Sequence, residues 1–250
     1  MFGRRWLEMT WRDGLFAHWA VDPVVVAETL PERLSVATYD GDAYLGVVAF
    51  VMDDIRPRGL PRGLSFPELN LRTYVEGPDG PGVYFYNLDA DDPIGVAVAR
   101  RLFALPYYRA EMRVRRTERP EGATDAGGPR IDFLSHRTHR GVPPAGFDAT
   151  YEPRGPARTA EPGSLEAFLV ENYRFYADGD RLYKGEIDHE PWRLRDVSAT
   201  IRRNGLFESN GFARPEEGGS RVSADGGRTA EPHLLYADPI DVTADRLRRV

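Results

Sequence analysis

The sequence has no cysteine, a single lysine and no long hydrophobic run. Because cysteine is absent, the chain can form neither disulfides nor thiolate metal sites. No stretch approaches the roughly 20 apolar residues that span a bilayer. The N-terminal stretch MFGRRWLEMTW contains arginines, but Glu8 and Arg12 interrupt any apolar run, unlike in a signal peptide. We therefore expect a cytoplasmic protein with no membrane partner.

Lys184 is the only lysine among 33 lysine and arginine residues. Chemistry that needs an amine, such as imine formation with a carbonyl compound, therefore has one side-chain candidate besides the N-terminal amine. Lys184 lies in RLYKGEID, a strand pattern that ends in a turn, and we interpret it as a surface residue. The net charge is −6 and no basic run has interleaved aromatics, so we expect no nucleic-acid partner.

The motifs of common cofactor and metal sites are also missing. No glycine-rich loop stands between a strand pattern and a helix pattern, and no Gly-x-Ser-x-Gly elbow occurs. His136 and His139 are three positions apart on a predicted strand, which directs them to opposite faces and disfavours a shared metal. We expect neither a cofactor nor a metal.

Strand patterns dominate what the sequence does contain. The continuous apolar run AYLGVVAFVM at 43–52 is typical of a strand buried on both faces, and 34–52 is interpreted as a hairpin around an Asp-Gly turn. The alternating stretch 68–75 and the stretch 83–89 form a second predicted hairpin around GPDGPG. Further strands are predicted at 109–116, 130–137, 147–152, 181–190, 196–203 and 233–237.

Three segments carry helix signals. The stretches 22–30 and 91–105 both begin with an Asp-Pro pair and stop before a proline, and 164–179 begins at a serine N-cap and ends at a glycine. Together with the strands, they predict a mainly antiparallel β fold of the α+β class with about three peripheral helices, as a single domain over 1–250. Mobile loops are predicted near 119–129 and 213–232.

The alternation in 68–75 separates two faces of the predicted strand. One face carries Leu69, Leu71 and Val75, and the other carries Glu68, Asn70, Arg72 and Tyr74. A solvent-exposed strand has such a polar face, and this is the simplest interpretation. If the face lines a cavity, its acid, amide, guanidinium and phenol would hold a ligand with a carboxylate or carbonyl group. The four polar residues are therefore candidate ligand-binding residues.

Histidine stands close to tryptophan at two places, HW at 18–19 and DHEPW at 188–192. A packed indole beside a hydrogen-bonded imidazole is the more common role of such pairs. The alternative is a role in ligand binding, which makes His18 and His189 candidate site residues.

Two tyrosines stand side by side in FALPYYRAEM, where Tyr107 and Tyr108 follow Pro106. Proline ends the preceding helix pattern, so the chain beyond it is expected to be extended. Neighbouring side chains of an extended segment point to opposite faces. We therefore expect one tyrosine to face a cavity and the other to pack elsewhere.

Four stretches, at 14–23, 66–112, 164–176 and 187–194, resemble in the same order the YqjF-like family. This family is a domain of unknown function within the acetoacetate decarboxylase-like superfamily. The resemblance implies a curved antiparallel sheet, close to a cone or barrel, that encloses a small-molecule cavity.

Acetoacetate decarboxylases carry a Pro-Lys-Lys tripeptide, whose first lysine forms a Schiff base with the keto acid while the second lowers its pKa. The matching tripeptide here is Pro106-Tyr107-Tyr108, and Glu68 is the counterpart of a decarboxylase glutamate. Tyrosine cannot form an imine. The resemblance therefore implies a retained cavity without Schiff-base chemistry, with Tyr107 and Glu68 at the catalytic positions and Tyr108 beside them.

Three hypotheses remain open at this point. The protein binds a small polar or carboxylated organic molecule, or it is an enzyme that uses Tyr107 as proton donor and Glu68 as base on a carbonyl compound. The third is a non-catalytic structural protein whose interior is filled. A cavity of about 300 Å³ or more would support the first two, and a carboxyl of strongly raised pKa inside it would favour catalysis. The sequence leaves a homo-oligomer open.

Overall fold

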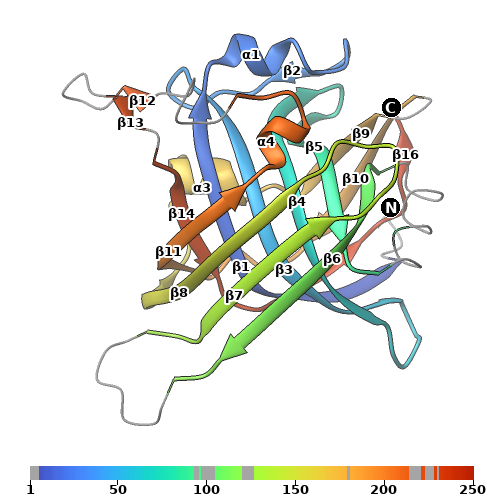
Figure 1. Ribbon diagram of the computed structural model, residues 1–250. Helices are drawn as coiled ribbons and strands as arrows, with labels where there is room; N and C mark the ends of the chain where they lie inside the picture. Colours follow the sequence, from blue (N-terminus) through green and yellow to red (C-terminus); the bar gives the residue numbers. More distant parts are fainter. Residues whose placement is uncertain are drawn as a thin grey trace.

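The computed structural model describes residues 6–92, 96, 105–119, 127–178, 181–213, 221–222, 228–229 and 231–250. Within these residues, one sheet of 14 strands forms most of the molecule (Figure 1). Its strands are β1 (Leu7–Val21), β2 (Ser35–Val36), β3 (Ala43–Pro57), β4 (Leu64–Gly77), β5 (Gly80–Ala90), β6 (Tyr107–Thr117), β7 (Arg130–Arg137), β8 (Gly146–Arg158), β9 (Arg174–Asp178), β10 (Leu182–Asp188), β11 (Leu194–Asn204), β14 (His233–Ala237), β15 (Ile240–Ala244) and β16 (Arg248–Arg249). A separate pair is formed by β12 (Arg221–Val222) and β13 (Arg228–Thr229), and the helices are α1 (Pro23–Ala27), α3 (Leu165–Val170) and α4 (Leu206–Ser209).

Strands β1, β3, β4 and β5 form an antiparallel central layer. Each outer strand of this layer has two further partners, because β1 pairs with β14 and β15, and β5 pairs in parallel with β6 and β9. The path β6-β7-β8-β11-β14 therefore covers one side of the layer, and β9-β10-β15 covers the other. The described strands close in a ring without forming a regular barrel (Figure 1). The predicted curved, mainly antiparallel sheet is confirmed.

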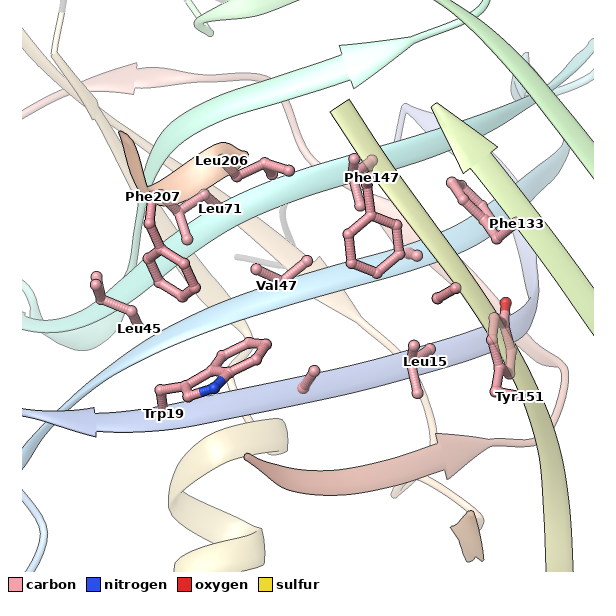
Figure 2. Packing of buried hydrophobic residues seen from close by; sticks show 14 of the residues in the cluster. Leu15, Trp19, Leu45, Val47, Leu71, Phe133, Phe147, Tyr151, Leu206 and Phe207 are labelled. Carbon is pink, nitrogen blue, oxygen red and sulfur yellow. The ribbon is translucent and has the colours of Figure 1, made fainter. Parts of the chain in front are cut away.

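Apolar side chains fill the side of the central layer that faces β6, β7 and β8. Val47 and Leu71 come from the layer, and Phe133 and Phe147 come from the strands that cover it (Figure 2). Helix α4 adds Phe207 to the same cluster. We call this the packed side of the central layer.

The predicted strand 43–52 is buried on both faces because β3 lies in the middle of the central layer. Val47 and Ala49 belong to the cluster on the packed side, whereas Val48 and Phe50 belong to the core of the opposite side. The continuous apolar run therefore reports two buried faces, as expected of an interior strand. The other strand predictions, from 68–75 through 233–237, each fall within a described strand, except that the predicted strand 181–190 extends beyond β10 at both ends.

The predicted helix 164–179 is correct only in its first part. The Ser164 side chain accepts a hydrogen bond from the Ala167 amide, as an N-cap does, but the helix ends at Val170 and the chain continues as strand β9. A Cβ on Gly77 would come within 2.3 Å of the Tyr176 ring, and one on Gly185 within 2.1 Å of the Phe175 ring. The β9 aromatics thus pack flat on glycines of other strands, and this tertiary packing overrides the local helix signal.

Two further local predictions differ from the structure. The predicted hairpin 34–52 is wrong, because β2 pairs with β4 and not with β3. Only the predicted turn is present, and an isolated bridge between Tyr39 and Asp42 closes it. Helix α1 begins at Pro23 after its Asp22 cap as predicted, but it ends at Ala27, short of the expected end at residue 30. The sequence patterns identified the turn and cap chemistry and did not reveal the long-range partners.

Several predictions fall on residues outside those described. The predicted helix 91–105 is described only at its edges and at Val96, which is helical. The predicted mobile loops 119–129 and 213–232 also lie mostly outside the described residues. Among the described helices, none has both the length and the apolar character required to span a membrane.

Candidate functional site

The polar face of β4 lies opposite the packed side. Glu68, Asn70 and Arg72 are buried, with Glu68 only 2% exposed, and all three line a cavity of about 160 Å³. The interpretation as a solvent-exposed strand face is therefore wrong. The cavity is smaller than the pockets of roughly 300 Å³ or more that hold drug-sized ligands, so its occupant has to be small. We call this the cavity side of the central layer.

Apart from these groups, most of the cavity wall is apolar. Phe50 and Met52 come from β3, Phe85 comes from β5, and Ile187 and Trp192 come from β10 and the segment after it. Both the central layer and the strands that cover it therefore contribute to the wall. A short aliphatic group would be stabilised by burial against such side chains.

Glu68 is the centre of the hydrogen bonding in the cavity. The Tyr107 hydroxyl donates to Glu68 Oε2 over 2.7 Å, and the Asn70 amide donates to Oε1 over 3.4 Å. Burial raises the pKa of Glu68 from 4.5 to about 7, although both hydrogen bonds oppose the shift, and the charge of Asp89 adds to it. Burial and the neighbouring Glu68 also raise the pKa of Tyr107 well above its ordinary value. Glu68 is thus a carboxyl that exchanges its proton near neutral pH.

The two tyrosines of the pair diverge, as the extended conformation predicted. Tyr107 lines the cavity next to Leu88, its neighbour on β5, whereas Tyr108 does not line it. Tyr108 instead contacts the Arg137 guanidinium, whose carbon lies 4.7 Å from the ring centroid, and the ring of His139. Of the pair, Tyr107 is therefore the one placed to meet a ligand.

A buried ion pair stands beside Tyr108. Arg137 and Asp89, both 1% exposed, approach to 2.9 Å. Asn87 donates to the same carboxylate, and burial raises the pKa of Asp89 to about 6 while Arg137 opposes the shift. Arg137 is therefore a buried cation whose charge is balanced by a carboxylate at hydrogen-bond distance.

Arg72 is a buried cation in a different environment. Its Nη2 donates to the carbonyl oxygen of Leu169 over 3.2 Å, and its guanidinium carbon lies 5.2 Å from the Phe16 ring centroid. Arg72 Nε has no hydrogen-bond partner, and no carboxylate pairs with this guanidinium in the part of the chain that the structure describes. Arg72 is only 9% exposed, so its positive charge is buried at the cavity without a counter-ion.

Tyr74 and His18 were expected at the site but do not line the cavity. The Tyr74 hydroxyl donates to the Leu169 carbonyl over 2.7 Å, and its pKa is raised by burial. His18 is fully buried 6.0 Å from the Tyr74 ring, and burial, followed by Arg72, lowers its pKa well below the ordinary value. A Cβ on Gly46 would lie 2.8 Å from the His18 ring, so glycine makes room for this neutral imidazole behind Arg72.

His189 does line the cavity. Its ring stacks on Tyr173 at 4.6 Å and lies 4.9 Å from Trp192. Its Nδ1 lies 2.7 Å from the carbonyl oxygen of Glu190, and its Nε2 is buried without a partner among the described residues. The imidazole is thus oriented by the backbone on one edge and available to a ligand on the other.

Sequence reasoning missed one buried polar group on the packed side, where Tyr151 donates to the Asp13 carbonyl oxygen, and one at the cavity. Asp13 is fully buried at a bulge of β1, with φ of 57°, and forms ion pairs with Arg12 and Arg116. The Asp-Gly dipeptide at 13–14 was the available signal, because it interrupts an otherwise apolar stretch. Trp11, whose buried indole N–H has no partner among the described residues, lines the cavity and was also missed.

Lys184 lies apart from the cavity wall. Its ammonium pairs with Asp79 and, at 3.5 Å, with Glu186, and the hydrogen bond to Asp79 raises its pKa. Lys184 was interpreted as a surface residue, and its side chain is in fact half-buried, at 17% exposed, but outside the cavity wall. An amine held as a cation by two carboxylates is a poor nucleophile.

Comparison with known proteins shows one curated relative of close sequence. The YqjF protein of Bacillus subtilis, described as uncharacterized, is 36% identical over 247 residues, which cover 97% of this chain and 92% of YqjF. The profile of a family described as uncharacterized conserved protein matches residues 8–241.

Solved structures similar to this fold include three enzymes of low sequence identity. The enduracididine biosynthesis enzyme MppR, with HEPES buffer bound, has a TM-score of 0.63 at 14% identity, covering 100% of this chain and 89% of MppR. Acetoacetate decarboxylase from Legionella pneumophila has a TM-score of 0.57 at 11% identity, and the match covers 100% of this chain and 87% of the decarboxylase. An acetoacetate decarboxylase-like enzyme from Sphingomonas wittichii has a TM-score of 0.56 at 16% identity, and the match covers 99% of this chain and 95% of that enzyme. The chain therefore belongs to the YqjF-like family of uncharacterized proteins, with the fold of acetoacetate decarboxylase-like enzymes.

Proposed function

We propose that this protein binds a small organic carboxylate in the cavity, with the carboxylate group against Arg72. The observation that carries the proposal is the buried Arg72 guanidinium, which no carboxylate pairs with among the described residues. A buried charge is costly unless it is paired, and guanidinium matches the planar fork of a carboxylate. A bound anion would supply the missing charge.

The size and chemistry of the cavity support a small ligand. About 160 Å³ lies between one polar face and mostly apolar walls, which suits a molecule with one charged end and a short carbon chain. The fold is also consistent with this use, since MppR has been solved in complex with pyruvate. The volume is below the roughly 300 Å³ that would by itself have favoured ligand binding over a filled structural interior. What supports binding against the structural hypothesis is the buried Arg72 charge, which has no carboxylate partner among the described residues.

Acid–base catalysis is a second candidate function, and the observation that favours it is the pKa of Glu68 at about 7. A group with this pKa can both accept and donate a proton at neutral pH. On this proposal, Glu68 takes a proton from a carbon next to the ligand carbonyl, and the Tyr107 hydroxyl, 2.7 Å from Glu68, orients the group. Binding without turnover needs only the same contacts, so Arg72 is essential to both.

The decisive experiment compares wild-type protein with Arg72→Met in calorimetric titrations with short carboxylates such as butyrate and acetoacetate. We expect the variant to lose at least about tenfold in affinity for every acid, since a charged hydrogen bond is removed. His136→Ala is the matched control, because His136 is exposed on β7. Equal affinities of wild type and Arg72→Met, or no binding by either, would reject the proposal.

An imine route is not part of this proposal, because the lysine position is Tyr107 and Lys184 lies away from the cavity. Incubation with acetoacetate and borohydride, followed by intact-mass measurement, should leave the protein unmodified at side-chain amines. A stable adduct mapped to Lys184 would contradict this expectation and make that residue a nucleophile.

A further inference from the structure

Six buried polar atoms without a hydrogen-bond partner, in the part of the chain that the structure describes, belong to residues that line the cavity. Two of them, Arg174 Nε and Asp245 Oδ1, belong to residues that also line a second, neighbouring pocket. The other four belong to residues that line this cavity alone, and they are Arg72 Nε, Trp11 Nε1, Asn70 Oδ1 and His189 Nε2. Buried polar atoms are nearly always paired in folded proteins, so four at one cavity indicate a missing partner. The chemical types of these atoms restrict what that partner is.

Two of the four atoms are hydrogen-bond donors. Arg72 Nε and Trp11 Nε1 each carry a hydrogen and cannot accept. They call for acceptor atoms on the ligand, and the carboxylate of the proposed function supplies them. These two atoms alone do not distinguish one carboxylic acid from another.

The other two atoms are acceptors. His189 Nδ1 lies 2.7 Å from the Glu190 carbonyl oxygen, and since a carbonyl only accepts, the hydrogen of the neutral ring is on Nδ1. His189 Nε2 therefore presents a lone pair. The Asn70 amide nitrogen donates to Glu68, which leaves its oxygen as the unpaired atom. Two lone pairs at the wall require a donor on the ligand.

Resting on the proposed function, we propose that the ligand is a short aliphatic hydroxy acid, with its carboxylate at Arg72 and its hydroxyl donating to Asn70 or His189. A simple fatty acid and a keto acid carry no donor, so both leave the two acceptors unpaired. An amino acid has a donor but would bring a second cation near Arg72, a like charge that opposes binding. The walls of Phe50, Met52 and Ile187 match the aliphatic remainder.

The test is a calorimetric comparison of four-carbon acids on the full chain, namely butyrate, acetoacetate, 2-aminobutyrate, and the 2- and 3-hydroxybutyrates in each stereoisomer. We expect at least one hydroxybutyrate to bind about tenfold or more tightly than butyrate, acetoacetate and 2-aminobutyrate, because one or two buried acceptors become paired. Butyrate or acetoacetate binding as tightly as every hydroxybutyrate would overturn the inference while leaving the proposed function intact. Tighter binding of 2-aminobutyrate would also overturn it, and no binding of any acid would reject both.

Variants separate a specific contact from a structural role. His189→Phe and Asn70→Leu each remove one acceptor at similar volume, and the variant that lacks the contacted acceptor should bind the preferred hydroxybutyrate about tenfold more weakly. Its affinity for butyrate should stay within about twofold of wild type, which also shows that the site is folded. Loss of butyrate and hydroxybutyrate affinity in equal proportion in both variants would overturn the inference, because it is the signature of a structural role alone.

Discussion

The two sides of the central layer are built from the same four strands, yet one side is packed with apolar side chains and the other encloses a cavity with polar groups. Successive residues of β4 alternate between them, so that Leu69 and Leu71 enter the packed side while Glu68 and Asn70 enter the cavity side. The packed side is filled by apolar side chains from the strands that cover it (Figure 2). A single strand thus contributes to the core with one face and to a ligand site with the other. Substitutions on the cavity face of β4 can therefore change the chemistry of the site while most of the packing on the other face is kept.

The two buried arginines show the same contrast. Arg137 has its carboxylate partner, Asp89, at 2.9 Å, and this pair holds strands β5 and β7 together. Arg72, on the cavity side, contacts a carbonyl oxygen and aromatic rings, and no carboxylate pairs with it among the described residues. A paired buried charge serves the fold, whereas an unpaired one at a cavity is costly unless a ligand pairs it. The comparison therefore predicts where mutations affect stability and where they affect binding.

Removing one aromatic ring from each side of the central layer should give the largest difference in the free energy of unfolding. Phe147→Ala on the packed side is expected to lower the free energy of unfolding by about 3–5 kcal/mol, since a fully buried ring leaves a void. Phe50→Ala on the cavity side should cost at least about 1 kcal/mol less, because part of that ring already borders a cavity. Urea unfolding of both variants measures the difference, and equal losses would contradict the division into a packed and an open side.

Glu68 should make stability fall as pH rises. Its pKa is about 7 in the folded protein against an ordinary 4.5, so the folded state binds this proton more tightly. The contribution is complete below pH 4.5 and is lost as pH rises through 7, a loss of up to about 3 kcal/mol. The pKa of Asp89, raised from 3.8 to about 6, acts on stability in the same direction, and a variant of Glu68 alone leaves this contribution in place.

The pH effect is isolated by comparing wild type with Glu68→Gln in urea unfolding from pH 5 to pH 8. The stability of the variant relative to wild type should increase over this range by up to about 3 kcal/mol, because it lacks the carboxyl that has to ionise while buried. A constant difference between the two proteins across the range would show that Glu68 titrates normally.

The tyrosine pair offers a matched test with smaller effects. Tyr107→Phe removes the hydrogen bond to Glu68 and should weaken carboxylate binding by about fivefold to tenfold, because it disturbs the group at the centre of the cavity. Tyr108→Phe removes a hydroxyl from a residue that does not line the cavity and should change binding by no more than about twofold. Calorimetric titration of both variants distinguishes them, and a larger effect from Tyr108→Phe would reverse the assignment of the two rings.

How far the sequence predicted this site depends on the range of the interactions involved. The polar row of β4 and the divergence of Tyr107 and Tyr108 follow from alternation within a strand, and both were predicted from local pattern. The choice between an exposed face and a cavity was not local, because it depends on β9, β10 and β15 covering the layer. The family resemblance pointed to a cavity, whereas the strand pattern alone did not.

The errors have the same origin. Residues 174–178 lie within the predicted helix 164–179, but Tyr176 and Phe175 pack on Gly77 and Gly185, which are distant in sequence. The expected hairpin partner of β2 was its neighbour in the chain, and the actual partner is β4. Strand β1 was missed because the bulge at Asp13 breaks its alternation. Long-range pairing decided each of these elements, and a single sequence carries little signal for it.

The smallest effect is expected at Lys184. This side chain lies outside the cavity wall and pairs with Asp79 and Glu186 near the surface, an arrangement that contributes little to stability. Lys184→Met should therefore leave carboxylate affinity within about twofold of wild type and should lower the melting temperature only slightly. Calorimetric titration and thermal unfolding test both expectations. If Lys184→Met abolished binding while Arg72→Met did not, the ligand would be held by an amine and not by a guanidinium. The cavity side would then have lost the unpaired charge that distinguishes it from the packed side.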